Sequence, residues 1–285
     1  MVRLLALGIL LSFSIPTLYA NAGARIPPET RMLQVNGHRI AFHVTPGHSP
    51  TIVLDAGGGL DSTYWTSLLP ALSRSTGSKI ITYDRAGMGA SEAVSGPWSL
   101  HGAERDLADG LRRLGATHDV ILVAHSMAGE IATAFAERHP QWLAGAVFVD
   151  ASVPQFYTPE EVQRVTAENK AMISALTHAP STPATRQLLA YAESFDATSR
   201  TFHDMKWPAS VPVIAIVSQK TPFDSPQDVS LWKRAQARFA NAASNRKLLI
   251  AHGSSHDIAH DKPAIILRAI HEMIARARPN AGGAH

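Results

Sequence analysis

The most specific chemical signal in the sequence is a serine on a predicted sharp turn. The segment Ala124-His125-Ser126-Met127-Ala128 directly follows an apolar, β-branched run and opens a helical pattern. A nucleophile on such a turn needs small residues two positions before and after it, because the strained backbone brings those positions against the adjoining strand and helix. Glycine is usual at both positions, and Ala124 and Ala128 satisfy the same size limit. We therefore predict that Ser126 is a nucleophile, the alternative being a serine that only caps the helix.

Two groups of backbone N–H donors are expected beside this serine. The turn directs the N–H of Met127 toward the place where an oxyanion would form. The glycine run Gly57-Gly58-Gly59 follows another apolar run, and glycines let N–H groups face a ligand without obstruction by a Cβ atom. The run lacks both the Gly-Lys-Ser/Thr ending of a P-loop and the spacing of a dinucleotide-binding fingerprint. We predict an oxyanion hole made by Met127 and by Gly57 or Gly58, between which the sequence does not choose.

These residues must be positioned by an alternation of strands and helices. Asn36-Gly37 separates two short apolar runs and predicts a β-hairpin, and six further runs have the composition of strands buried on both faces. The eight predicted strands span residues 32–35, 39–44, 51–55, 79–83, 119–124, 145–149, 213–217 and 246–250. Helical patterns at 100–114, 126–139 and 263–277 lie between or after them. This alternation predicts a mostly parallel, doubly wound α/β sheet that binds ligands at the carboxyl ends of its strands.

One stretch interrupts the alternation. Residues 154–212 contain no convincing strand, and helical patterns at 160–176 and 185–194 are joined by a Pro- and Thr-rich connection. The stretch is too long for a plain connection, so we predict a helical cap at about 154–210. An ordinary surface excursion is the alternative.

Five motifs in this order resemble the α/β-hydrolase superfamily over nearly the whole chain outside the cap. They lie at residues 55–59, 83–91, 124–128, 148–152 and 253–257. The resemblance implies an eight-stranded, mostly parallel sheet flanked by helices, and a serine hydrolase with a helical cap. It also implies that His256, between the last strand and the final helix, is the general base for Ser126.

A metal site is the alternative interpretation of the histidines His252, His256 and His260. Two histidines four residues apart can share a metal on a helix, whereas Gly253-Ser254-Ser255 predicts a loop. We therefore predict no metal and no cofactor. As general base, His256 would take the Ser126 proton and later return one to the leaving group.

The third member of the site is less well defined. Many relatives place an acid after the seventh strand, where this chain reads Lys220-Thr221-Pro222 and then, further on, Asp224. Other members, including some lipases and dehalogenases, carry the acid just after the sixth strand, where Asp150 lies. We favour Asp150, which could orient the imidazole and stabilise the imidazolium. Asp224, Asp257 and the absence of an acid remain alternatives.

The expected activity is hydrolysis of an ester or related acyl substrate through an acyl-enzyme. Serine at position 126 argues against dehalogenase and epoxide-hydrolase chemistry, for which relatives use aspartate. Lactonase, amidase, C–C hydrolase and hydroxynitrile-lyase activities remain open on the same residues. A non-catalytic, ligand-binding relative is the alternative from a different class.

The composition and net charge of the chain limit the kinds of partner that it is expected to bind. The chain has 285 residues, 45% hydrophobic and 17% charged, which suits one α/β domain with an insertion. Its net charge of +3 is small and no run of Lys and Arg is present, so we expect a small-molecule substrate and no nucleic-acid partner. The oligomeric state is left open.

The N-terminus predicts export. Arg3 precedes an apolar run at 4–18, and Ala20-Asn21-Ala22 offers small residues for cleavage, so residues 1–22 have the layout of a signal peptide. We expect a secreted or periplasmic domain of residues 23–285 with no membrane span after cleavage. The alternative is a retained anchor. The chain contains no cysteine, so its stability must come from the core alone.

Overall fold

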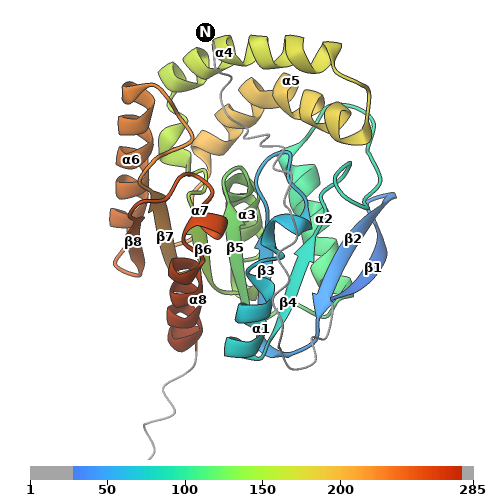
Figure 1. Cartoon of the computed structure of the whole chain (residues 1–285), viewed down its shortest axis with the longest axis vertical. Helices are drawn as coiled ribbons and strands as arrows, with labels where there is room; N and C mark the ends of the chain where they lie inside the picture. The colour runs from blue at the N-terminus through green and yellow to red at the C-terminus, as the bar shows by residue number, and fades with distance from the viewer. Residues whose placement is uncertain (1–27, 278–285) are drawn as a thin grey trace, which may run out of the picture.

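The computed structural model describes residues 28–277, so the predicted signal peptide lies outside the described residues. Its centre is one eight-stranded sheet with the order β1-β2-β4-β3-β5-β6-β7-β8 (Figure 1). β1 and β2 are antiparallel to their neighbours, and the other pairs are parallel. The strands are β1 (Glu29–Val35), β2 (His38–Thr45), β3 (His48–Asp55), β4 (Ser78–Tyr83), β5 (Val120–His125), β6 (Leu143–Val149), β7 (Val213–Ser218) and β8 (Arg246–Ala251). The predicted eight-stranded, mostly parallel sheet is confirmed.

Helices cover both faces of the sheet because consecutive strand residues point to opposite faces. On one face, Phe148 belongs to the core cluster that also takes residues from α2 (Leu100–Arg113), α3 (Ala128–Arg138) and α6 (Pro226–Asn241). On the other face, its neighbour Val147 belongs to the cluster shared with α1 (Leu69–Thr76) and α8 (Pro263–Ala277). Shorter elements are η1 (Ser62–Trp65), η2 (Pro140–Trp142), η3 (Pro154–Phe156) and α7 (Ile258–Asp261). This is the layered arrangement that the strand–helix alternation predicts.

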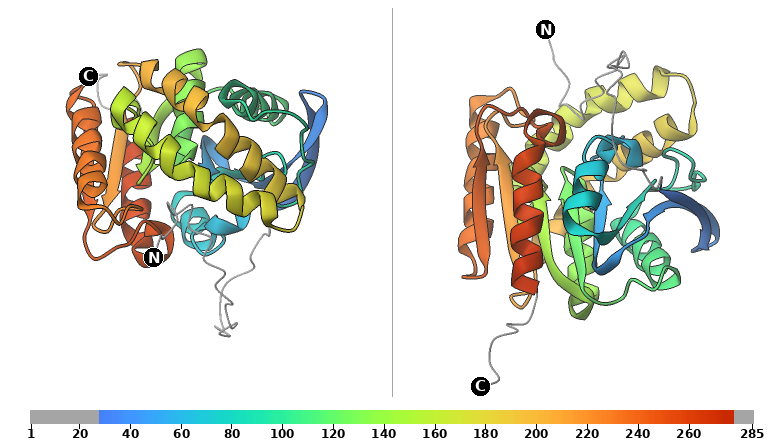
Figure 2. Two further views of the ribbon diagram at one scale, coloured as in Figure 1. Left: turned by 90° about the horizontal axis from the view of Figure 1, so that it is seen from above. Right: turned by 60° about the horizontal axis from the view of Figure 1, so that its bottom comes forward.

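The stretch between β6 and β7 contains η3 and two long helices. These are α4 (Pro159–His178) and α5 (Pro183–Asp204), and the predicted helical patterns lie within them. α5 begins with a reciprocal capping box, in which Thr182 and Thr185 each bond the other's backbone N–H. Figures 1 and 2 show α4 and α5 lying together across one end of the sheet.

Strand β8 differs from its prediction. We expected burial on both faces, but β8 is an edge strand, most of its residues are only partly covered, and Ile250 is 50% exposed. An apolar run indicates a strand without showing how far the helices beside it extend. The prediction of a strand at this position is confirmed, and the prediction of two-sided burial is wrong.

Candidate active site

Ser126 lies on the turn between β5 and α3. Its φ angle of +55° is in the left-handed region, which is unfavourable for a residue with a Cβ atom. The turn is held at both ends of the residue, since the Ser126 N–H donates to the carbonyl of Val149 at 3.3 Å and the Ser126 carbonyl accepts from Ser152 N–H at 2.8 Å. Ala124 and Ala128, the two positions that the size rule restricts, are fully buried. The side chain of Ser126 itself remains partly accessible.

His256 connects the serine to a carboxylate. Its Nε2 lies 2.9 Å from Ser126 Oγ, and its Nδ1 lies 2.7 Å from Asp150 Oδ2. The loop that carries His256 is tied to α7, because Ser255 donates from its N–H and its hydroxyl to Asp261 Oδ2. The structure therefore brings together Ser126, His256 and Asp150, three residues singled out from the sequence.

Asp150 is completely buried and held by several donors. Its Oδ1 accepts from the indole N–H of Trp232 at 2.9 Å and from the Ser218 N–H at 3.2 Å. Its Oδ2 accepts from the Ser218 hydroxyl at 2.5 Å in addition to His256. These donors fix the plane of the carboxylate. No sequence pattern indicated Ser218 or Trp232 as its partners, since they lie 68 and 82 residues further along the chain.

The alternative acids lie elsewhere. Asp224 is exposed on the loop after β7. Both carboxylate oxygens of Asp257 face His260 Nδ1, at 2.8 and 3.0 Å. Among the described residues, Asp150 is the only carboxylate hydrogen-bonded to His256.

The predicted oxyanion loop follows β3 and closely approaches the serine. A Cβ atom added to Gly57 would lie 2.8 Å from His125 Nδ1 and 3.2 Å from Ser126 Cβ, so glycine is required there. Within the part of the chain that the structure describes, the N–H groups of Met127, Gly57 and Gly58 donate to no acceptor. All three predicted donor positions are therefore free to bind an oxygen.

A buried arginine holds this loop. Arg85 forms an ion pair with Asp55, donates to the carbonyls of Ala56 and Gly57, and reaches Leu60 O at 3.2 Å. Burial raises the pKa of the Asp55 carboxyl, and the charge of Arg85 opposes that change. The arginine thus stabilises the backbone path that presents the Gly57 and Gly58 N–H groups.

His125 contacts the backbone of the loop that carries His256. Its Nε2 lies 3.2 Å from the carbonyl of His256, and its ring stacks on Tyr64 with centroids 4.6 Å apart. Burial, and next the neighbouring His256, lower the pKa of His125 well below its ordinary value. His125 is therefore a neutral ring that donates from Nε2 to the backbone of the loop that carries His256.

Glu130 is a buried carboxyl that the sequence analysis missed. It is 2% exposed on α3, and its Oε1 accepts from the hydroxyls of Tyr157 at 3.1 Å and Tyr191 at 3.2 Å. Burial raises its pKa to about 7, against the lowering effect of the two hydroxyls. A lone glutamate among the apolar residues of 128–136 was the available signal. Through these tyrosines Glu130 links α3 to α5 and to the residue that follows η3.

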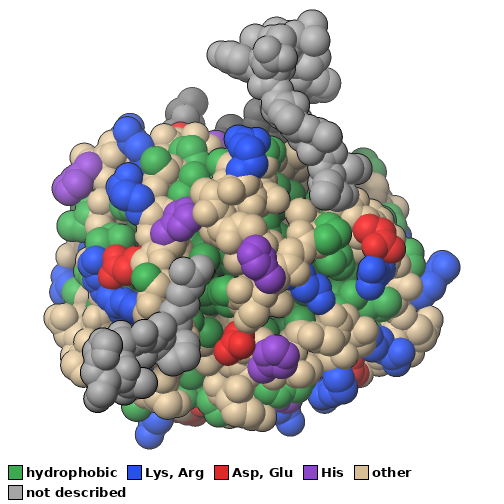
Figure 3. Space-filling model, turned by 90° about the horizontal axis from the view of Figure 1, so that it is seen from below, with side chains coloured by type: hydrophobic (Ala, Val, Ile, Leu, Met, Phe, Trp, Pro, Cys, Tyr) green, Lys and Arg blue, Asp and Glu red, His purple; other side chains and the backbone are tan. Residues whose placement is uncertain are grey.

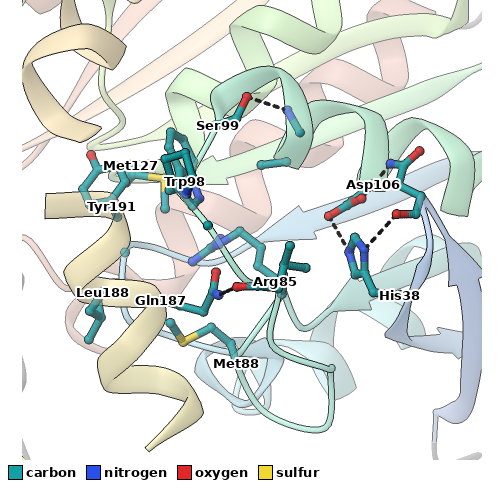
Figure 4. A pocket seen from close by; sticks show the side chains of 18 of the residues that line it. His38, Arg85, Met88, Trp98, Ser99, Asp106, Met127, Gln187, Leu188 and Tyr191 are labelled. Carbon is teal, nitrogen blue, oxygen red and sulfur yellow. Dashed lines mark hydrogen bonds and ion pairs between the residues drawn. The ribbon is translucent and has the colours of Figure 1, made fainter. Parts of the chain in front are cut away.

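A cavity of about 260 Å³ borders the glycine loop and the residue after Ser126, although Ser126 and His256 themselves do not line it. Gly58 and Met127 line it, and in Figure 4 Met127 lies beside Trp98 and Tyr191 at one side while His38 and Asp106 lie at the other. Its walls come from the β1–β2 hairpin, the glycine loop, the segment between β4 and α2, the first turns of α2, and α5. The site therefore has a small adjoining space for a substrate.

Other features of the described residues bear on partners. No group of three or more His, Cys, Asp or Glu side chains is arranged around a possible metal position, and none of the described helices has the length and apolarity to cross a bilayer. His260, considered with His252 as a metal ligand, instead faces Asp257. On the face drawn in Figure 3, Lys and Arg side chains are spread around the surface.

Comparison with known proteins gives the class. Residues 52–283 match the alpha/beta hydrolase family, so the chain belongs to this family and is a hydrolase by class. It is 24% identical over 227 residues to the uncharacterized protein YqjL of Bacillus subtilis (strain 168). The alignment covers 78% of this chain and 83% of YqjL.

Two solved structures share the fold. A thermophilic esterase from Thermogutta terrifontis is 20% identical, with a TM-score of 0.60 and coverage of 88% of this chain and 100% of the esterase. An enol-lactonase from Burkholderia xenovorans LB400 is 18% identical, with a TM-score of 0.58 and coverage of 86% and 100%.

Proposed function

We propose that the protein hydrolyses a small ester through a Ser126 acyl-enzyme. The single observation that carries the proposal is the continuous chain of hydrogen bonds from Ser126 through His256 to Asp150. Ser126 Oγ lies 2.9 Å from His256 Nε2, and His256 Nδ1 lies 2.7 Å from Asp150 Oδ2. A serine hydroxyl is a weak nucleophile until a base within hydrogen-bond reach takes its proton.

Each step of the reaction has a group to perform it. His256 Nε2 accepts the proton as Ser126 Oγ bonds to the carbonyl carbon, and it then protonates the departing alcohol. A water molecule, deprotonated by the same nitrogen, attacks the acyl-enzyme and releases the acid and free Ser126. Asp150, fully buried and acceptor to Nδ1–H, keeps the imidazole in the required tautomer and stabilises its charged form.

The tetrahedral intermediates carry a negative oxygen, for which backbone donors are available. The N–H of Met127 lies in the serine's own turn, and Gly57 of the loop after β3 closely approaches Ser126, so the free N–H groups of Met127 and of Gly57 or Gly58 are the proposed donors. Donors fixed in advance stabilise developing charge without reorganisation. The cap at about 154–210 contributes Gln187, Leu188 and Tyr191 to the wall of the adjoining cavity, so we propose that it shapes substrate choice.

Lactone opening, amide hydrolysis and C–C bond cleavage would use the same residues. The small cavity and the likeness in fold to an esterase and an enol-lactonase favour esters and lactones as the first substrates to test. A substrate panel of short-chain esters, lactones and amides ranks these activities by kcat/KM.

Active-site labelling tests the proposal against a non-catalytic role. A fluorophosphonate probe should label the wild-type protein and the Ser174→Ala control, whose serine lies exposed on α4, but not Ser126→Ala. Equal labelling of Ser126→Ala, or no labelling of the wild type, would refute a serine hydrolase.

We also propose that residues 1–22 direct export and are removed. Mass spectrometry of protein from the periplasmic fraction of a Gram-negative host should find an N-terminus at Asn21 or Gly23. An intact N-terminus in the membrane fraction would indicate a retained anchor, and intact protein in the cytoplasm would refute export.

A further inference from the structure

The cavity lined by Gly58 and Met127 has two chemically different ends. Near the oxyanion loop its wall is aromatic and apolar, formed by Trp98, Met127 and Tyr191 (Figure 4). The other end is formed by the β1–β2 hairpin and by α2, and contains His38, Asp106 and Arg105. A substrate that fills the cavity would therefore place an apolar segment next to the reacting carbonyl and a polar group away from it.

The charged side chains of the wall differ in how far their hydrogen-bonding capacity is already used. Its formally charged Lys, Arg, Asp and Glu residues are Arg85, Arg105 and Asp106. Arg85 is neutralised from behind by Asp55. Asp106 already accepts on both oxygens, from Asn36 Nδ2 at 2.7 Å and from His38 Nε2 at 2.9 Å.

Arg105 is the charged residue of the wall that has no ion-pair partner in the described part of the chain, although its charge acts on the nearby carboxyls of Asp106 and Glu104. It is an exposed residue of α2 that borders the cavity, and among the described residues no carboxylate lies within ion-pair distance of it. A guanidinium presents a fork of N–H donors that matches a carboxylate. The wall thus offers, at the end remote from Ser126, a cation that no described carboxylate engages in an ion pair.

The start of α2 adds to this polarity. Ser99 caps the helix by accepting from the Gly102 N–H at 3.2 Å, which leaves the Ser99 hydroxyl proton free to donate toward the cavity that both residues line. The first turn of α2 contains no acidic residue that would oppose an anion. Arg105 supplies a full positive charge and these groups supply weaker positive potential, while the Asp106 carboxylate in the same wall acts against both.

We propose that the substrate is a small ester carrying a carboxylate at the end remote from its ester group, and that Arg105 binds this carboxylate. The inference rests on the proposed ester hydrolysis. A volume of about 260 Å³ restricts the fit to a short aliphatic chain between the two groups. Arg105 would act on substrate choice, since it lies at the cavity end formed by the hairpin and α2, away from the oxyanion loop.

Two matched ester pairs test the proposal whichever side of the ester bears the charge. Monomethyl adipate is compared with methyl hexanoate, and 6-acetoxyhexanoate with hexyl acetate, by following acid release in a pH-stat. The wild type should prefer the carboxylate-bearing member of at least one pair by about tenfold in kcat/KM, the factor that corresponds to about 1.4 kcal/mol for one charge-assisted contact. Arg105→Gln should lose this preference, so that its kcat/KM for the carboxylate-bearing ester falls to that for the neutral member of the same pair.

Arg113→Gln is the matched control, because Arg113 is an exposed arginine of the same helix that does not line the cavity. It should keep the preference. Ser126-dependent hydrolysis of the neutral esters with no preference for either charged one, or a preference that survives in Arg105→Gln, overturns the anionic-substrate inference and leaves ester hydrolysis standing. Absence of Ser126-dependent hydrolysis of all four esters refutes the proposed function, and the inference falls with it.

Discussion

Replacing Glu130 by glutamine should change how the stability of the protein depends on pH. The carboxyl is 2% exposed, its Oε1 accepts from Tyr157 and Tyr191, and its Oε2 has no hydrogen-bond partner among the described residues. A carboxylate with only two donors is poorly compensated when buried, so burial raises the pKa of Glu130 from 4.5 to about 7.

The size and sign of the effect follow from linkage. In the native state the Glu130 carboxyl holds its proton up to about pH 7, whereas in the unfolded chain it releases the proton near pH 4.5. The stabilisation that the neutral carboxyl provides is therefore fully present below pH 4.5 and lost as the pH rises through 7. At roughly 1.4 kcal/mol per pKa unit, the loss amounts to about 3 kcal/mol. Glutamine has nearly the same shape, offers an amide oxygen to both tyrosines and does not ionise, so its variant should escape this loss.

Urea unfolding of wild type and Glu130→Gln, measured from pH 4 to pH 8.5, checks the prediction. The variant should gain about 3 kcal/mol relative to the wild type across this range, with most of the change between pH 4.5 and 7. Glu193→Gln, an exposed glutamate of α5, should follow the wild type. A constant difference between Glu130→Gln and wild type at all pH values would refute the argument.

Three further substitutions test the site. Asp150→Asn should lower kcat on an activated ester by roughly 10⁴-fold, whereas Asp224→Asn should leave it within about twofold, and the reverse result would move the acid to the loop after β7. Gly57→Ala should lower kcat by roughly 10² with little change in KM, because its methyl group would lie 2.8 Å from His125 Nδ1 and displace the oxyanion loop. Arg85→Met should reduce the free energy of unfolding in urea by roughly 3–5 kcal/mol, since it leaves its carboxylate partner buried and unpaired, and an unchanged midpoint would contradict this role.

Much of the fold could be predicted because each strand is a short apolar run bounded by turn residues. Asn36-Gly37 specifies the hairpin directly, and both residues adopt the positive φ angles that such a turn needs. Ser126 could be singled out for a similar local reason, since the turn between a strand and a helix fixes the size of its neighbours. Local rules of this kind do not predict the solvent exposure of β8, because that exposure depends on how far distant helices extend over the sheet.

The remainder of the site depends on contacts between distant segments. Asp150 and Asp224 both follow predicted strands, and the direction of His256 Nδ1 toward Asp150 is a property of the assembled sheet. Likewise, the surroundings of Glu130 come from the residue after η3 and from α5, which precede β7 in the chain but pack against α3. The spacing of residues along the sequence does not show which side chains of two distant segments will come into contact in the folded protein.

The left-handed backbone at Ser126 bears on how this protein could be changed by selection or engineering. Ser126 has a φ angle of +55°, and Asp150 has one of +44°. Glycine adopts this conformation without the penalty of roughly 1 kcal/mol that a side chain incurs, so a search for stability alone would favour glycine at position 126. At position 150 the hydrogen bonds from Ser218 and Trp232 to the buried carboxylate oppose the same replacement. The backbone conformation by itself therefore does not account for the serine. A library screened only for thermal tolerance would tend to remove Ser126, the residue on which hydrolysis is proposed to depend, and such a screen should be paired with selection for turnover.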